Sequence, residues 1–272
     1  MNLNENQNEI IEDNSIETTA KTTVNPWIER AKGILLLIIF YISQQVAAFF
    51  MVLLIISLGG REAFMAGEFK PEWATYTFWG MFISNIIFII ALIYHYRSKL
   101  SISLHKVLLG LGKFSLKTIG YFVLFTVVTI LFNVLDTMLF PQFVGQVGEN
   151  QEMIDAALTG TPSLGMILAI CVGAPIVEEY VFRYGLISKL SFGLNKYIGV
   201  VIAALVFSFY HIGFSQMGDL AYFAHLMLGY LGSALVFGFV YVREDNLAYP
   251  IVIHMLGNIQ SVIFIIASAG ML

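Results

Sequence analysis

The sequence has little charge, because only 12% of its 272 residues are Asp, Glu, Lys or Arg. Soluble domains carry about twice that share, and this supply is too small to cover the surface of a water-soluble globule of this length. Hydrophobic residues make up 58% of the chain, whose mean hydropathy is +0.81. The composition argues against ordinary cytosolic folds and disordered chains, and it predicts a polytopic protein in contact with the lipid bilayer.

Cysteine and clustered basic residues are also scarce. The single cysteine, Cys171, excludes an internal disulfide and a thiolate cluster for zinc or iron. The 14 Lys and Arg are outnumbered by 18 Asp and Glu, which gives a net charge of -4. Because neutralisation of phosphates needs clustered Lys and Arg, we expect no nucleic acid as a partner.

The chain does contain seven long stretches without charge. They are residues 33–60, 73–96, 118–135, 156–177, 197–218, 220–242 and 246–272. Each reaches the roughly 18–20 residues that a helix needs to cross about 30 Å of hydrocarbon. Amides inside lipid must be paired within the segment, and the alternation typical of a membrane barrel is missing. We predict an all-α protein with seven transmembrane helices, and two shorter stretches, 101–112 and 137–148, leave an eighth open.

The distribution of Lys and Arg predicts an orientation in the cell membrane. With the N-terminus inside, 11 of these residues lie in inner segments and only Arg61 and Lys70 lie in outer loops, leaving Arg183 aside. Such an excess marks the cytoplasmic side, so we expect a cytoplasmic N-terminus and an extracellular C-terminus. Residues 1–30 are predicted to be a polar, disordered cytoplasmic tail, and residues 31–272 a single membrane domain.

One predicted span contains charges where lipid makes them costly. The fourth span runs from its apolar part into Glu178 and Glu179, and an ionisable residue inside a span costs at least about 2.5–3.5 kcal/mol. Arg183 follows Glu179 by four residues, the spacing of an ion pair on a helix, which leaves Glu178 free for chemistry. Pro175 is expected to loosen this helix. The alternative is a helix that ends at Val177, with the charges among the headgroups.

Two further spans carry polar side chains at a similar depth. His211 lies in the fifth span, and His254 and Asn258 lie four residues apart on one face of the seventh. At about 1.5 Å per residue from the cytoplasmic ends, Glu178 lies about 16 Å deep, His211 about 22 Å, His254 about 13 Å and Asn258 about 20 Å. We predict a polar catalytic cavity between helices four, five and seven. His225 in the sixth span has no such partner and is expected to be structural.

These residues form three ordered motifs: Glu-Glu-x-x-x-Arg ending at Arg183, Phe-x-x-x-His ending at His211, and His-x-x-x-Asn ending at Asn258. The ordered set resembles the CAAX protease and bacteriocin-processing family (CPBP or Abi) of intramembrane endopeptidases, which includes the eukaryotic Ras-converting prenyl-protein endopeptidase. The resemblance covers a protease-like core at about residues 160–262. It departs in the penultimate span, where Leu231 and Ala234 replace a Phe and a Gly. Since Ala234 preserves a small residue, the change affects packing rather than chemistry.

The resemblance implies hydrolysis of a peptide bond in a membrane-embedded or lipidated peptide or protein. Glu178 would be the general base, with His211 helping to deprotonate a water molecule. His254 and Asn258 would stabilise the tetrahedral oxyanion, a task suited to donors fixed in a water-poor cavity. Bacteriocin self-immunity or peptide processing is the biological role that the family implies.

The resemblance leaves the catalytic type open between a glutamate-dependent and a metallo-endopeptidase. Glu178, His211 and His254 can ligate zinc, which often takes three protein ligands and a water, or they can act on water directly. The sequence lacks the His-Glu-x-x-His signature, and we favour the metal-free mechanism. In either case Glu179 and Arg183 would support the helix and tune Glu178.

Two functions from other classes also follow from the residues. A proton-coupled transporter would use Glu178 and the histidines as a proton relay, although the sequence shows no inverted repeat. A catalytically silent membrane scaffold of the same fold would bind partner proteins, but it has no need for all four polar residues.

Overall fold

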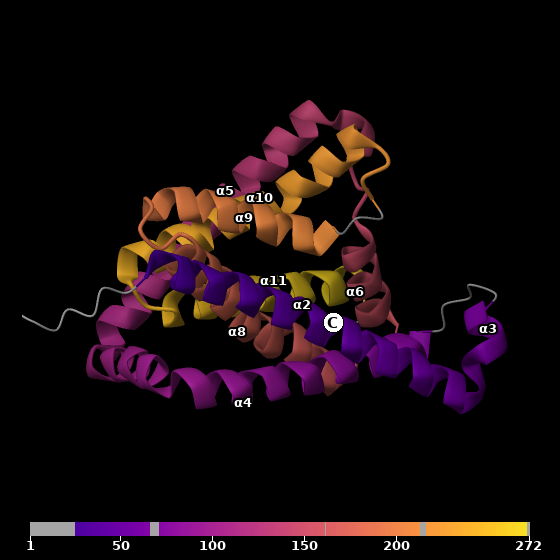
Figure 1. Cartoon of the computed structure of the whole chain (residues 1–272). Coiled ribbons are helices and arrows are strands. Elements are labelled where there is room, and N and C mark those ends of the chain that lie inside the picture. The colour runs from indigo at the N-terminus through magenta and orange to yellow at the C-terminus, as the bar shows by residue number, and fades with distance from the viewer. Residues whose placement is uncertain (1–24, 66–70, 161, 213–215, 271–272) are drawn as a thin grey trace, which may run out of the picture.

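The computed structural model describes residues 25–65, 71–160, 162–212 and 216–270, and the regular elements in these ranges are helices (Figure 1). The all-α prediction is therefore confirmed for the described residues. Most of the predicted tail, residues 1–24, lies outside them. Helix α2 (Pro26–Ile55) already begins at Pro26 because Asn25 Oδ1 accepts the Trp27 N–H at 2.9 Å and proline suits the first turn of a helix. Residues 26–30 are thus helix rather than tail.

Each predicted span contains a helix. Five helical stretches of the described residues are long and apolar enough to cross a membrane: Pro26–Leu58, Leu111–Leu139 (α5), Leu164–Leu190, Leu220–Glu244 (α10) and Ala248–Ser268 (α11). The other two apolar helices are shorter, and they are Phe78–Ile90 within α4 (Pro71–Leu109) and α9 (Lys196–Ile212). This set of helices supports a polytopic membrane protein, and five of the seven predicted spans are both long and apolar enough for a crossing within the described residues.

The two stretches that left an eighth span open form no further span in the described residues. Residues 101–109 are the last turns of α4, and Gly110 separates them from the start of α5. Residues 137–148 contain the end of α5, a short turn η2 (Pro141–Phe143) and the residues that lead to helix α6.

Helix α6 (Glu149–Thr159) is an element that the charge-free windows did not predict. It is polar, with Glu149 and Glu152 in its first turn, and it buries Ala157 and Leu158. It contacts α4, α9 and α11, and it lies beside one end of α11 (Figure 1). A short amphipathic helix of this kind gives no long apolar run, so hydropathy alone does not reveal it.

The fourth span is the buried centre of the molecule. It consists of α7 (Leu164–Leu168), η3 (Ala169–Gly173), α8 (Ala174–Glu179) and η4 (Tyr180–Leu190). Of its most apolar window 61% is buried, against 11% in the first span and 6% in α5. Contacts with α2, α4, α9 and α11 surround it. The protein itself therefore shields the charges of this span, whereas the exposed apolar sides of α2 and α5 are suited to contact with lipid.

His225 has the structural role that was predicted, but it does have a partner. Its Nδ1 lies 2.8 Å from Asp136 Oδ2 of α5, and its Nε2 lies 3.1 Å from the Gln146 carbonyl oxygen. The side chain thereby ties α10 to the end of α5 and to the segment that precedes α6. This pair could not be predicted from the sequence, because Asp136 is 89 residues away along the chain.

Candidate active site

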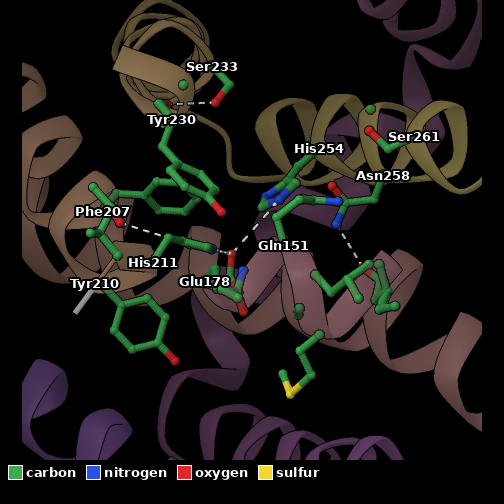
Figure 2. Close-up of a pocket in the computed structure, with 18 of the residues that line it drawn as sticks. Gln151, Glu178, Phe207, Tyr210, His211, Tyr230, Ser233, His254, Asn258 and Ser261 are labelled. Atoms are coloured by element: carbon green, nitrogen blue, oxygen red, sulfur yellow. Dashed lines mark hydrogen bonds and ion pairs between the residues drawn. The ribbon is translucent and has the colours of Figure 1, made fainter. Parts of the chain in front are cut away.

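A cavity of about 1050 Å³ lies between the helices, and Figure 2 shows residues that line it. Its lining includes all four residues predicted to carry chemistry: Glu178, His211, His254 and Asn258. Helices four, five and seven of the prediction, now α8, α9 and α11, supply these side chains. Further lining residues come from α2, α4, α5, α6 and α10, so the cavity is wider than the predicted space between three helices.

The fourth helix continues past the two glutamates to Leu190, so the alternative of a helix ending at Val177 is wrong. Adjacent residues on a helix point about 100° apart. The side chain of Glu178 accordingly faces the cavity and is 11% exposed, whereas that of Glu179 is 0% exposed. The two carboxylates therefore occupy different environments although they are neighbours in sequence.

The predicted ion pair between Glu179 and Arg183 is confirmed. Arg183 Nε lies 2.8 Å from Glu179 Oε2, and Arg183 Nη2 donates to Glu179 Oε1 at 3.1 Å. Both side chains are 0% exposed. The guanidinium carbon also lies 5.1 Å from the centre of the Phe207 ring and 5.5 Å from that of Phe237. Charge pairing and two aromatic faces together offset part of the cost of burying this arginine.

Glu179 has a second partner that the sequence did not reveal. His254 Nδ1 lies 3.0 Å from Glu179 Oε1 (Figure 2 shows His254 beside the site). Because a carboxylate only accepts hydrogen bonds, Nδ1 must carry the proton of this bond. The other nitrogen, Nε2, faces Glu178 Oε2 at 3.9 Å. The His254 ring is also stacked on Phe237, with 4.7 Å between ring centres, so its orientation is fixed from two sides.

His211 is held in a similar way. Its Nδ1 lies 2.9 Å from the Phe207 carbonyl oxygen, which again assigns the proton to Nδ1. Its Nε2 faces Glu178 Oε2 at 3.7 Å. The ring lies between two aromatic rings, with Phe207 at 4.3 Å and Tyr230 at 4.8 Å between centres. This arrangement explains why the Phe-x-x-x-His spacing is useful, since it puts a carbonyl acceptor and a ring face beside the same imidazole.

The oxygen of Glu178 that faces the cavity is therefore flanked by the Nε2 atoms of two imidazoles. Separations of 3.7 Å and 3.9 Å are too long for direct hydrogen bonds. They are short enough for one water molecule to contact all three atoms. Within the described ranges, no group of three or more His, Cys, Asp or Glu side chains is placed to hold a metal ion. We therefore derive no step through zinc, and the metal alternative for Glu178, His211 and His254 stays a prediction to be tested.

Asn258 reaches the cavity from α11, but one of its amide hydrogens is already used. Its Nδ2 donates to the carbonyl oxygen of Ile170 at 2.8 Å (Figure 2). The Ile170 carbonyl oxygen is free to accept this bond because of Pro175. The helix is wider just before this proline, at η3, where the Ala174 N–H bonds the Ala169 carbonyl oxygen, one residue further back than in an α-helix. Pro175 has no N–H to bond Ile170 in that wider register. The Asn258 amide supplies the missing donor and retains its second N–H.

Several polar side chains around the cavity were not predicted from the sequence, among them Gln151 on α6, Tyr210 on α9 and Tyr230 on α10. Gln151 lies on a helix that was not predicted, and its Nε2 donates to Asp155 at 2.6 Å. The two tyrosines carry hydroxyl groups inside apolar spans, which was the available signal. Tyrosine also packs as an aromatic residue, so spacing alone did not distinguish the two roles.

Comparison with known proteins agrees with the motifs. Residues 160–260 match the family model described as type II CAAX prenyl endopeptidase, Rce1-like. The match includes all four polar cavity residues of the motifs, and it agrees with the core predicted at about residues 160–262. These residues are a domain of that family, and the resemblance is confirmed. No curated protein and no solved structure matches the chain.

Proposed function

Because residues 160–260 form an Rce1-like domain of the CAAX endopeptidase family, we propose that the chain is an intramembrane endopeptidase acting on a membrane-embedded or lipidated peptide. The observation that carries this proposal is the approach of two imidazole Nε2 atoms, 3.7 Å and 3.9 Å away, to one oxygen of Glu178. This arrangement provides a base, a partner to orient water and a group beside the developing charge. A role in bacteriocin self-immunity or in peptide processing is part of the proposal.

In the proposed reaction a water molecule lies between Glu178 and His211. Glu178 accepts a proton from the water, and His211 Nε2 accepts a hydrogen bond from it and orients it. The hydroxide oxygen then bonds to the peptide carbon, and the carbonyl electron pair moves to its oxygen. When the tetrahedral intermediate collapses, the proton on Glu178 passes to the leaving nitrogen.

The negative charge on the carbonyl oxygen needs donors in the cavity. Asn258 offers its second N–H. His254 can donate from Nε2 when its ring carries a second proton, and the Glu179 carboxylate at 3.0 Å from Nδ1 stabilises that charged ring. Arg183 pairs with Glu179 and fixes it in place. This is how the supporting pair acts on the site without entering the cavity.

The experiment compares cleavage by the purified full chain in lipid nanodiscs with cleavage by Glu178→Gln and His211→Ala variants. The probes are fluorogenic peptides with and without a farnesyl thioether. Loss of a general base is expected to lower the rate by about 10²- to 10⁴-fold. The matched control is Glu152→Gln, because Glu152 is an exposed glutamate of α6 that does not line the cavity.

Three results would contradict parts of the proposal. Equal cleavage by the wild type and both variants would overturn it. Proton flux in liposomes that needs Glu178, without any peptide cleavage, would favour the transporter. Cleavage that chelators abolish and zinc restores would assign Glu178, His211 and His254 to a metal centre, whereas we expect chelators to leave the rate unchanged.

A further inference from the structure

The hydrogen-bond donors that surround Glu178 are largely committed to other partners. His254 Nδ1 lies 3.0 Å from Glu179, and His211 Nδ1 lies 2.9 Å from a backbone carbonyl oxygen. Asn258 Nδ2 donates to Ile170 at 2.8 Å. The oxyanion of the proposed reaction therefore has one spare amide hydrogen, and an imidazole that donates only in its charged form. A further neutral donor in the cavity would complete its stabilisation.

Tyr230 places a hydroxyl in this position. It reaches the cavity from α10, and its ring is stacked on His211, with 4.8 Å between centres and 29° between planes. Figure 2 shows the hydroxyl directed toward the space that His211, His254 and Glu178 share.

A second contact leaves the hydroxyl hydrogen available. The side chain of Asn150, on α6, approaches the Tyr230 oxygen as a hydrogen-bond donor. A phenol both donates and accepts, so an oxygen that accepts from Asn150 can still donate its own hydrogen into the cavity. The stacked ring and the Asn150 contact together hold the phenol from two directions, which is the preorganisation that an oxyanion donor needs.

We propose that Tyr230 is a further catalytic residue, whose hydroxyl donates a hydrogen bond to the oxyanion of the tetrahedral intermediate. The inference rests on the proposed function. The water oxygen forms its bond to the peptide carbon, its proton goes to Glu178, and the carbonyl pair moves to the oxygen that Tyr230 contacts. Tyr230 transfers no proton. As the C–N bond breaks, the pair returns to the carbonyl and the hydrogen bond weakens.

The test is Tyr230→Phe, which keeps the ring stacked on His211 and removes only the hydroxyl. In the same nanodisc assay we expect kcat to fall by about 10²-fold or more, as for other single oxyanion donors, while KM stays within about threefold. A phosphinate peptide, which imitates the tetrahedral intermediate, should bind the variant more weakly by a similar factor. A substrate analogue in which a methylene-amine group replaces the peptide bond has no carbonyl oxygen. It should therefore bind the wild type and Tyr230→Phe equally.

The matched control is Tyr222→Phe. Tyr222 lies on the same helix, but its hydroxyl donates to the Val147 carbonyl oxygen at 2.9 Å and the residue does not line the cavity. A wild-type rate in Tyr230→Phe, beside inactive Glu178→Gln, would overturn the role of Tyr230 and leave the proposed function standing. Failure of the wild type to cleave any of the peptides would overturn both. Equal losses in Tyr230→Phe and Tyr222→Phe would assign the hydroxyls to helix packing.

Discussion

His254 Nδ1 and Glu179 Oε1 lie 3.0 Å apart, and the same carboxylate binds Arg183 through both oxygens. The second glutamate of the pair is therefore a link between a buried cation and an imidazole of the candidate active site. Its neighbour Glu178 faces the cavity. One helix thus provides the reacting carboxylate and, about 100° away around its axis, the carboxylate that orients the reacting imidazole.

This link predicts different outcomes for single and double variants. Arg183→Met leaves Glu179 buried without its cation, and Glu179→Leu leaves Arg183 buried without its anion. Each is expected to lower the free energy of unfolding by about 3–5 kcal/mol. The double variant removes both charges and should recover most of that stability. Its kcat should nevertheless stay about 10²-fold below the wild type, since His254 has lost the acceptor that fixes its ring.

Thermal unfolding in detergent and peptide cleavage in nanodiscs measure the two effects separately. The control is Glu29→Gln together with Lys189→Met, a pair that joins α2 to η4 and whose side chains do not line the cavity. It should change stability and leave kcat near the wild-type value. A double variant of Glu179 and Arg183 that is stable and fully active would show that Glu179 serves packing alone.

Contacts between residues of one helix could be predicted from the sequence, whereas contacts that depend on how helices pack against one another could not. The Glu179–Arg183 pair followed from its spacing of four residues, and the similar depths of Glu178, His211 and His254 predicted a common cavity. No spacing rule brings His254 to Glu179, 75 residues apart, or Asp136 to His225. These contacts depend on helix rotation and register, which packing determines.

The hydrogen bond between Asn258 and Ile170 also could not be predicted from the sequence, and it leads to a second prediction. Asn258→Ala leaves the Ile170 carbonyl without a donor, which should cost about 1 kcal/mol of stability. Pro175→Ala restores a backbone N–H at the wide turn η3. In that background the stability cost of Asn258→Ala should shrink, because the backbone can then satisfy Ile170. Unfolding of the four proteins of this double-mutant cycle provides the measurement.

Cleavage by the same four proteins tests the proposed role of Asn258 in the reaction. If its second N–H stabilises the oxyanion, Asn258→Ala lowers kcat by about 10²-fold in both backgrounds. A loss of activity that Pro175→Ala repairs would contradict this role and assign Asn258 to holding η3 in place. The conservative variant Asn258→Gln serves as a control for the polarity of the site, since it keeps the amide but displaces it.

The charge distribution predicts which ends of the helices face the cytoplasm, and two exposed positions test it. Gly218, between α9 and α10, has nothing within 4 Å of an added Cβ, and Leu194, between η4 and α9, is 49% exposed. In intact cells a membrane-impermeant maleimide should label Gly218→Cys, on the predicted outer side, and should label Leu194→Cys only after permeabilisation. The wild type is the blank, because its one cysteine, Cys171, is only 4% exposed. The opposite labelling pattern would contradict a cytoplasmic N-terminus, since the excess of Lys and Arg would then lie on the outer side against the usual bias.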